Sequence, residues 1–179
     1  MIRVDEHISL ELIKEHHASA AFTLLNENRE YLAPWIPTVT QVKTLDDFYT
    51  FLKGVKKRHD ERQEKAFVIT RDGILIGKIG LYYIDHQNRI AKIGYWIGEQ
   101  HQGQGVITKC CRALIDYAFD ILELNRIEIK CATENKKSQE IPERLGFTRE
   151  GVMREGELHQ DKFLDMFLYA ILRCDWPVN

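Results

Sequence analysis

The feature that most constrains this chain is a strand-to-helix turn containing glycine, at residues 93–108. Residues 93–97 are apolar like a strand, Gly103 and Gly105 punctuate a polar turn, and apolar residues recur at helical spacing from Val106. Glycine lets a backbone approach an anion closely, and the first N–H groups of a helix lack intrahelical partners and favour negative charge. The stretch therefore predicts a phosphate-binding turn, with an ordinary strand-to-helix connection as the alternative.

Two familiar phosphate-binding motifs do not fit this turn. A dinucleotide-binding fingerprint needs the full Gly-x-Gly-x-x-Gly pattern, whereas this turn lacks it and comes late, after a predicted antiparallel meander. A P-loop needs Gly-Lys followed by Ser or Thr, which does not occur here. The ligand of the turn is thus left open by the motif alone.

Length and composition predict a single domain over residues 1–179 with a sizeable core. The formal net charge of −2 argues against a stable nucleic-acid partner. Neither a signal-peptide core nor an apolar run long enough to span a bilayer is present, so we expect a cytoplasmic protein without a membrane partner.

Cysteine and histidine spacing predicts no metal. Adjacent histidines such as His16 and His17 point apart on a helix, and no carboxylate–histidine cluster has ligand spacing. The cysteines lack zinc-type spacing and read as reduced, mostly buried thiols: Cys110, Cys111, Cys131 and Cys174.

The order of the predicted elements indicates an α+β fold. Strands are predicted at residues 8–12, 66–70, 74–84, 90–97, 127–132, 147–154 and 162–172, and helices at 18–25, after a Thr44/Asp47 capping box, at 106–122 and at 135–145. Short turns such as Asp72-Gly73 make the middle antiparallel, whereas the helix at 106–122 returns the chain to a parallel strand. We therefore expect a mixed, mostly antiparallel sheet of about seven strands flanked by helices.

This element order, together with three local motifs, resembles the GNAT superfamily of N-acetyltransferases. The motifs are the turn at residues 102–107, Asn-Lys-Lys-Ser at 135–138 and Arg-Leu-Gly-Phe at 144–147. Residues 28–37, residues 150–154 and Tyr169-Ala170 are similar to the branch of RimL-type ribosomal-protein N-terminal acetyltransferases. The resemblance implies the acyl-CoA N-acyltransferase fold, acetyl-CoA as co-substrate, and acetyl transfer to a primary amine, foremost the N-terminal α-amine of a ribosomal protein. The resemblance also makes a homodimer an option.

The superfamily turn reads Gln/Arg-x-x-Gly-x-Gly/Ala. Starting from Gln102 it aligns the following helix but puts Ile107 where Gly or Ala is expected, whereas starting from Gln100 it fits formally with Gly103 and Gly105. We prefer the Gln102 register. The resemblance then implies that the strand at 93–97 splays from residues 129–133 and that the coenzyme contacts these residues: Tyr95, Trp96, Ile97, Gln102, Gly103, Gln104, Gly105, Val106, Ile107, Thr108, Asn135 and Ser138.

Asn135 and Ser138 open a predicted helix, where either residue could serve as a cap. The resemblance implies that Asn135 contacts the coenzyme arm. Many members of the superfamily carry a tyrosine acid at the position of Pro142, so the resemblance instead points to Ser138 as the donor of a proton to the thiolate leaving group. Plain capping by Ser138 stays an equal alternative.

An amine must lose a proton before it can attack a thioester, because amines are mostly protonated near pH 7. The resemblance points to Glu157, in the connection between the last two strands, as the base or as a binder of a cationic acceptor. Glu30 and Asp165 are weaker alternatives, and Asp165 reads better as a structural hydrogen-bonding group. Residues implied to bind the acceptor are Arg29, Trp35 and Glu157.

Two other functions remain open at this level. A small-amine or antibiotic acetyltransferase would keep the chemistry and change the acceptor. A non-catalytic acyl-CoA-binding module would explain the missing tyrosine and Ile107.

Overall fold

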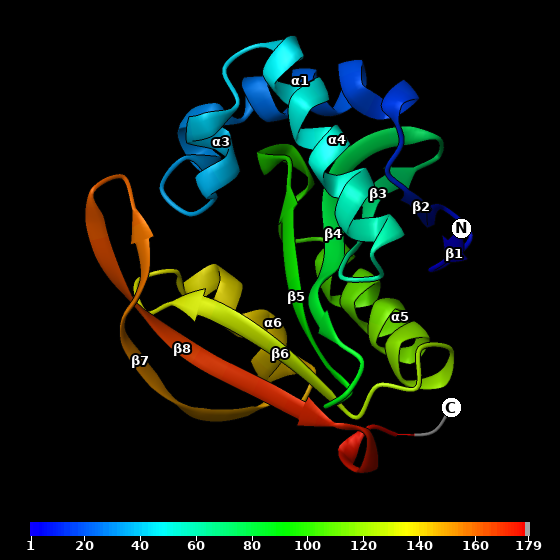
Figure 1. The fold of residues 1–179 in the computed structure, drawn as a ribbon, viewed down its shortest axis with the longest axis vertical. Helices are drawn as coiled ribbons and strands as arrows, with labels where there is room; N and C mark the ends of the chain where they lie inside the picture. Colours follow the sequence, from blue (N-terminus) through cyan, green and yellow to red (C-terminus); the bar gives the residue numbers. More distant parts are fainter. Residues whose placement is uncertain (178–179) are drawn as a thin grey trace.

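The computed structural model describes residues 1–177, which form one mixed sheet of eight strands with helices on both faces (Figure 1). The strands are β1 (Ile2–Arg3), β2 (Ile8–Leu12), β3 (Lys65–Arg71), β4 (Ile74–Asp85), β5 (Ile90–Ile97), β6 (Arg126–Ala132), β7 (Thr148–His159) and β8 (Lys162–Leu172). Their order in the sheet is β1-β2-β3-β4-β5-β6-β8-β7. The predicted α+β class is confirmed. The eighth strand, which was not predicted, is β1. Its two residues are too few to show an alternating pattern in the sequence.

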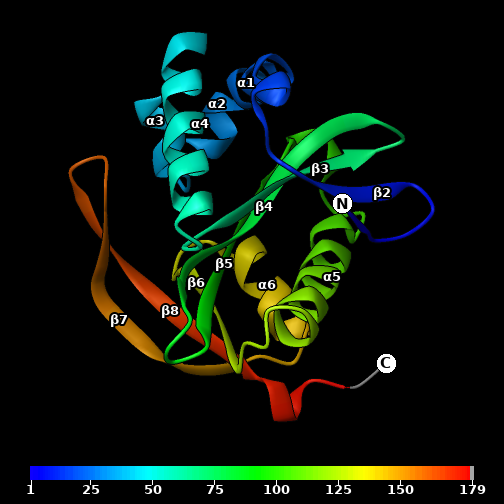
Figure 2. The ribbon, with the colours of Figure 1, turned by 45° about the vertical axis from the view of Figure 1, so that its right-hand side comes forward.

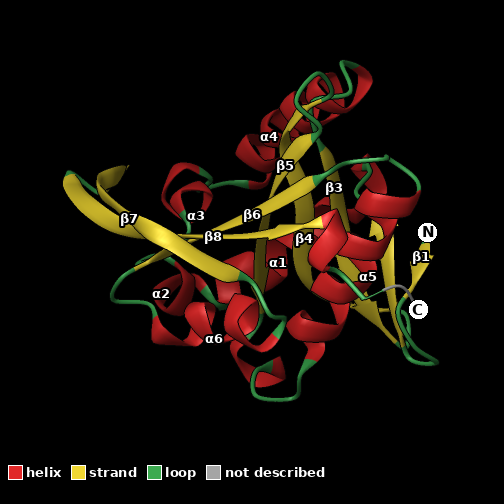
Figure 3. Cartoon of the chain, turned by 90° about the horizontal axis from the view of Figure 1, so that it is seen from below, coloured by secondary structure: helices red, strands yellow, loops and turns green. Residues whose placement is uncertain are grey.

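Helices form a layer on each face of the sheet (Figure 2). They are α1 (Ala18–Glu27), α2 (Arg29–Leu32), α3 (Pro37–Gln41), α4 (Leu45–Asp60), α5 (Val106–Asp120) and α6 (Lys136–Arg144). Seen from below, α4 and α6 lie on opposite sides of the strands (Figure 3). None of the helices among residues 1–177 is both long and apolar enough to cross a membrane.

Two apolar cores follow from the alternation of side chains along β4 and β5. Ile79 of β4 and Ile93 of β5 join α5 in the main core, whereas Trp96 packs against the cluster formed by α1 to α4. Successive residues Tyr95 and Trp96 therefore face opposite sides of the sheet, so the two helix layers share β5 as a common wall.

The central opening of the fold lies between β5 and β6 (Figure 1). These two strands run parallel and pair only from Ile90 with Arg126 to Ile93 with Ile129. Beyond that point they diverge, so residues 94–97 have no strand partner on the side of β6. The predicted splay is confirmed.

Local sequence signals account for most element boundaries. Asp47 N–H donates to Thr44 Oγ1 (3.1 Å) and Thr44 N–H donates to Asp47 Oδ2 (2.8 Å), so the predicted capping box is confirmed. The charged residues after Val55 do not end this helix, and α4 continues through Asp60. An ion pair between Lys56 and Asp60 (2.6 Å) and basic residues near the negative end of the helix dipole favour the extra turn.

The last hairpin differs from the prediction. Residues 155–161 were expected to form a connection, but β7 continues to His159 and turns at Gln160 and Asp161, which both have positive φ. Pairing with β8 shifts register between Met153 and Glu157. Glu157 therefore lies on a strand, opposite Leu164, because the irregular segment is absorbed as a bulge within the strand.

Candidate active site

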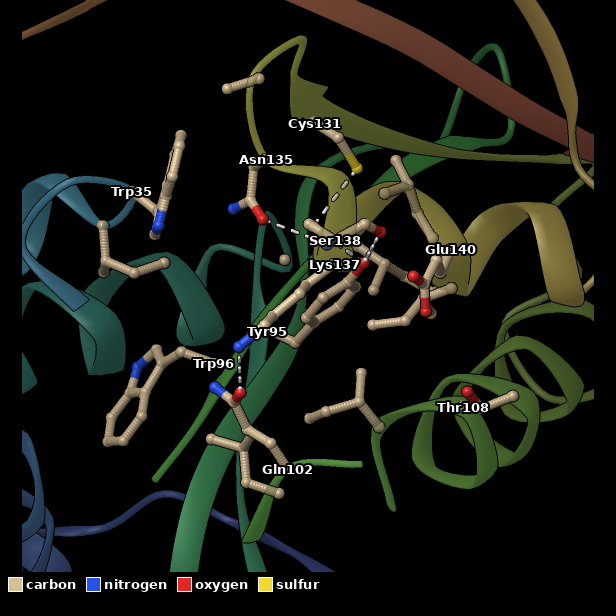
Figure 4. Close-up of a pocket in the computed structure, with 18 of the residues that line it drawn as sticks. Trp35, Tyr95, Trp96, Gln102, Thr108, Cys131, Asn135, Lys137, Ser138 and Glu140 are labelled. Atoms are coloured by element: carbon tan, nitrogen blue, oxygen red, sulfur yellow. Dashed lines mark hydrogen bonds between the residues drawn. The ribbon is translucent and has the colours of Figure 1, made fainter. Parts of the chain in front are cut away.

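A cavity of about 980 Å³ lies at the opening between β5 and β6 (Figure 4). Its walls come from α2 and the residues after it, from β5 with the glycine turn and the start of α5, from β6 with α6, and from the β7–β8 hairpin. The predicted residues that line it are Trp35, Tyr95, Trp96, Ile97, Gln102, Gly103, Gly105, Val106, Ile107, Thr108, Asn135, Ser138 and Glu157. The structure thus brings segments more than one hundred residues apart to one cavity.

The glycine turn presents free amides to this cavity. Gly103 and Gly105 have φ of 69° and 71°, a conformation that side-chain-bearing residues rarely adopt. Gly105 is the N-cap of α5 and offers no side chain, and the first intrahelical bond runs from Lys109 N–H to the Gly105 carbonyl (3.0 Å). The N–H groups of Val106, Ile107 and Thr108 therefore lack intrahelical acceptors and are available to an anion.

Ile107 departs from the family turn, and the structure explains how the larger side chain fits. Ile107 is 8% exposed and packs into the main core with Val106 and Cys110. Because the side chain is directed into the core, it leaves the backbone N–H of residue 107 unobstructed.

Basic side chains surround the free amides. Lys109, Lys137 and Arg144 all line the cavity. Lys137 Nζ donates to Gln102 Oε1 (3.1 Å), and Arg144 Nη1 donates to Thr108 Oγ1 (3.2 Å). Lys137 lies over the turn because α6 packs beside α5, a long-range contact that the sequence does not show. The site has the charge expected of a binder of phosphate groups.

Ser138 is held within a small polar cluster facing the cavity (Figure 4). Its Oγ lies 3.2 Å from the Tyr95 hydroxyl and 3.3 Å from Cys131 Sγ. The Tyr95 hydroxyl also donates to the Ser138 carbonyl (3.1 Å). Asn135 Oδ1 accepts from Ser138 N–H (3.1 Å), so capping of α6 belongs to Asn135 and the Ser138 hydroxyl serves no capping role.

Burial determines the protonation state of this cluster. It raises the pKa of Tyr95 well above its ordinary value and the pKa of the Cys131 thiol to about 11. Near neutral pH both groups are protonated. The Cys131 thiol therefore carries little thiolate, which disfavours it as a nucleophile.

Tyr31 and Trp35 line the cavity from α2 and the residues after it, and Glu157 lines it from β7. Trp35 and Trp96 lie on the same side of the view in Figure 4, apart from each other, and Ser138 lies further along the cavity. At the tip of the β7–β8 hairpin, the side chain of Gln160 donates to the Ala33 carbonyl (2.9 Å). This contact fixes the strand that carries Glu157 over the segment that carries Trp35.

Lys130 is a cavity residue that the sequence did not single out. It lies on β6, and burial together with the nearby charge of Lys92 lowers its pKa, while Glu128 and Glu157 act in the opposite direction. In the sequence, the alternation of Lys130 with the apolar residues Ile129 and Cys131 indicated only a strand.

Four residues considered from the sequence do not line this cavity. Arg29 donates to the carbonyls of Val39 and Val42 (2.9 Å to the latter) and ties α2 to α3. Gln104 turns outward, where its Oε1 accepts from Arg71 (2.6 Å). Glu30 is exposed, and Asp165 accepts from Glu155 N–H (2.7 Å), the structural role expected for it. Among residues 1–177, no group of three or more His, Cys, Asp or Glu side chains could hold a metal ion.

Replacing Gly105 by alanine is expected to weaken acetyl-CoA binding at least about tenfold in calorimetry. The left-handed conformation costs a non-glycine residue about 1–2 kcal/mol, and relaxing it turns the amides of the first helical turn. Gly73→Ala is the matched control, because Gly73 has φ of 79° and, like Gly105, open space around its Cβ direction. Equal loss of affinity in both variants would show that the turn geometry is not what binds the coenzyme.

Known proteins with this geometry are acetyltransferases. The profile of the acetyltransferase (GNAT) domain matches residues 7–148. YdaF of Bacillus subtilis, a predicted ribosomal N-acetyltransferase, is 35% identical over 97% of this chain and 96% of its own length. The ribosomal-protein-serine acetyltransferase of Escherichia coli is 33% identical over 94% of each chain.

A solved structure extends the likeness to the fold. RimL, a ribosomal L7/L12 alpha-N-protein acetyltransferase in complex with coenzyme A, superposes with a TM-score of 0.92 at 26% identity, covering 96% of this chain and 97% of RimL. The match of the GNAT profile to most of the chain, with relatives above 30% identity over nearly its whole length, is sufficient for assignment. The chain belongs to the GNAT family of acetyltransferases.

Proposed function

We propose that this chain transfers the acetyl group of acetyl-CoA directly to the N-terminal α-amine of a ribosomal protein. The observation that carries the proposal is the continuous path from the free amides of α5, along the unpaired edge of β5, to Glu157. The names of the two curated relatives and of RimL support a ribosomal protein as the acceptor.

Each part of this path suits one part of acetyl-CoA. The amides of residues 106–108 with Lys137 and Arg144 suit the pyrophosphate. Residues 94–97 offer an unpaired strand edge, to which the amide groups of the pantetheine arm can add as an extra strand would. This arrangement brings the thioester to the β5 edge near Ile97, where backbone N–H groups can polarise its carbonyl oxygen.

The chain then has to move two protons. Glu157, directly or through water, takes the proton of the incoming amine beside Trp35. The neutral amine attacks the thioester carbonyl, so a C–N bond forms and the C–S bond breaks. Ser138, in contact with Tyr95, is placed to give a proton to the departing thiolate. No acyl-enzyme is needed in this scheme.

The test is acetyl-CoA turnover by the purified protein against a library of N-terminal peptides, polyamines and aminoglycosides, with mass detection of products. We expect monoacetylated peptides modified at the α-amine. Preferential acetylation of polyamines or aminoglycosides would replace the proposed acceptor. Coenzyme binding without transfer to any acceptor would make the chain a non-catalytic acyl-CoA-binding module.

A further inference from the structure

A second cavity, of about 760 Å³, adjoins the first one on the α4 side of the sheet. The two share Ile36, Gly94, Tyr95 and Trp96 as lining residues. The shared stretch of β5 includes the edge where the thioester is proposed to lie. Whatever occupies the second cavity is therefore close enough to be part of the acceptor.

Lys78 lines this cavity from β4. Lys78 on β4 pairs with Trp96 on β5, and Gly80 pairs with Gly94. A Cβ atom at Gly80 would lie 2.9 Å from the Tyr82 ring and from the Lys65 carbonyl oxygen, so glycine is required there for Tyr82 to fold back over the sheet. In that position the Tyr82 hydroxyl reaches Lys78 Nζ (3.1 Å).

The Lys78 side chain is largely buried, and its ammonium has no negative partner among residues 1–177. Lys78 is 9% exposed, and its Nζ lies 4.8 Å from the ring centroid of Phe51 and 5.3 Å from that of Tyr82. Among residues 1–177, no carboxylate forms an ion pair with Lys78, whose one side-chain hydrogen bond is to a neutral hydroxyl. Burying an unpaired charge is costly, so this ammonium favours an anionic group in the cavity.

The two carboxylates that line the cavity are engaged elsewhere. Glu64 pairs through Oε2 with Arg58, and Asp85 accepts from the backbone and side chain of Asn88 (2.8 and 2.7 Å) in the β4–β5 turn. Glu64 is 2% exposed and its Oε1 has no hydrogen-bond partner. The cavity thus presents an ammonium that neither of these carboxylates pairs with, which suits a group bearing a carboxylate.

We infer that the second cavity binds the acceptor chain next to its reacting amine, and that Lys78 binds a carboxylate side chain there. This inference rests on the proposed function. Neighbouring strands lie about 4.8 Å apart, and an extended peptide advances about 3.3–3.6 Å per residue. An Asp or Glu among the first three residues of the acceptor is therefore within reach of Lys78 while the α-amine lies at the β5 edge.

The experiment compares pairs of acceptor peptides that differ only by Asp versus Asn, or Glu versus Gln, at positions two and three. For the wild type we expect kcat/KM about tenfold higher for the acidic member, mainly through KM, as for a charge-assisted contact of about 1.4 kcal/mol. Lys78→Met should bring the ratio close to one, and Lys78→Arg should restore part of it. Lys53→Met, on the exposed side of α4, is the control that keeps the wild-type ratio.

Several results would overturn the inference. Equal kcat/KM for both members of each pair in the wild type would contradict the inference about Lys78 and leave the proposed function intact. A Lys78→Met variant that binds acetyl-CoA normally and keeps the full preference would do the same. If the wild type acetylates neither member, the proposed function fails and the inference falls with it. Because the wild-type ratio needs no variant, a poorly folded Lys78→Met does not prevent the test.

Discussion

Replacing Glu157 by glutamine is expected to lower kcat for acetyl transfer by about 10²–10⁴-fold, with the affinity for acetyl-CoA unchanged. The side chain lines the cavity from β7, whereas the amides proposed to bind the coenzyme belong to the start of α5, so its loss should affect the amine and not the phosphates. Glutamine keeps the size and most of the hydrogen bonding but cannot accept a proton. Steady-state kinetics with the best peptide acceptor, together with calorimetry for acetyl-CoA, measures both effects.

The pH dependence separates a base from a binder of cations. Without a base the variant must use the amine that is already neutral, a fraction that rises about tenfold per pH unit below the α-amino pKa of about 8. Turnover by Glu157→Gln should therefore climb by up to about tenfold per pH unit below that value, which narrows the gap to the wild type as the pH rises. A variant that raises KM and leaves kcat intact would assign Glu157 to acceptor binding only.

Glu30→Gln provides the matched control for this experiment. Glu30 is an exposed glutamate on α2 that does not line the cavity, although the sequence left it open as an alternative base. It should retain wild-type kcat and KM. A large loss of kcat at Glu30 with none at Glu157 would contradict the assignment of the base.

Local signals made much of this architecture predictable. The Thr44/Asp47 box and the Asp72-Gly73 turn each depend on neighbours within four residues, and both occur as expected. Gly105 likewise adopts the positive φ that a turn feeding a helix start requires. Such features are set by backbone sterics and short hydrogen bonds, which a sequence displays directly.

The features that were missed depend on long-range contacts. Glu157 lies on a strand because β8 pairs with it, and nothing in residues 155–161 shows that pairing. Arg29 looked available for a ligand, but the carbonyls at the end of α3 take its guanidinium. Lys78 stands among the apolar residues of a strand, and only the packing of α4 over β4 reveals that its ammonium is buried beside a cavity.

The resemblance to the GNAT superfamily predicted the residues of the site more completely than local sequence patterns did. Asn135 and Ser138 are both common helix caps, so residue type alone could not show which of them caps the helix. The structure does, because Asn135 Oδ1 accepts from the Ser138 N–H and leaves the Ser138 hydroxyl facing Tyr95 and Cys131. Two residues three positions apart can therefore be tested independently for stability and for catalysis.

Replacing Ser138 by alanine is expected to lower kcat by about 10²-fold while leaving the stability of the fold nearly unchanged. The variant loses the hydroxyl proposed to protonate the thiolate but keeps the backbone N–H that Asn135 caps. Asn135→Ala should show the reverse pattern, with a loss of about 1 kcal/mol in the free energy of unfolding and a smaller loss of kcat. Denaturant unfolding and single-turnover acetyl transfer measure the two quantities for each variant.

Ser138→Thr distinguishes proton donation from packing, because threonine keeps a hydroxyl at this position and should recover much of the lost kcat. The groups next to the Ser138 hydroxyl matter for comparing the alanine and threonine variants. Burial keeps both the Cys131 thiol and the Tyr95 phenol protonated near neutral pH. Either could pass a proton to a bound water if the hydroxyl were dispensable, and Ser138→Ala would then turn over at the wild-type rate. A deficit shared by the alanine and threonine variants would instead tie the loss to altered packing around Tyr95. Only a deficit in alanine that threonine repairs assigns the proton of the leaving thiol to Ser138.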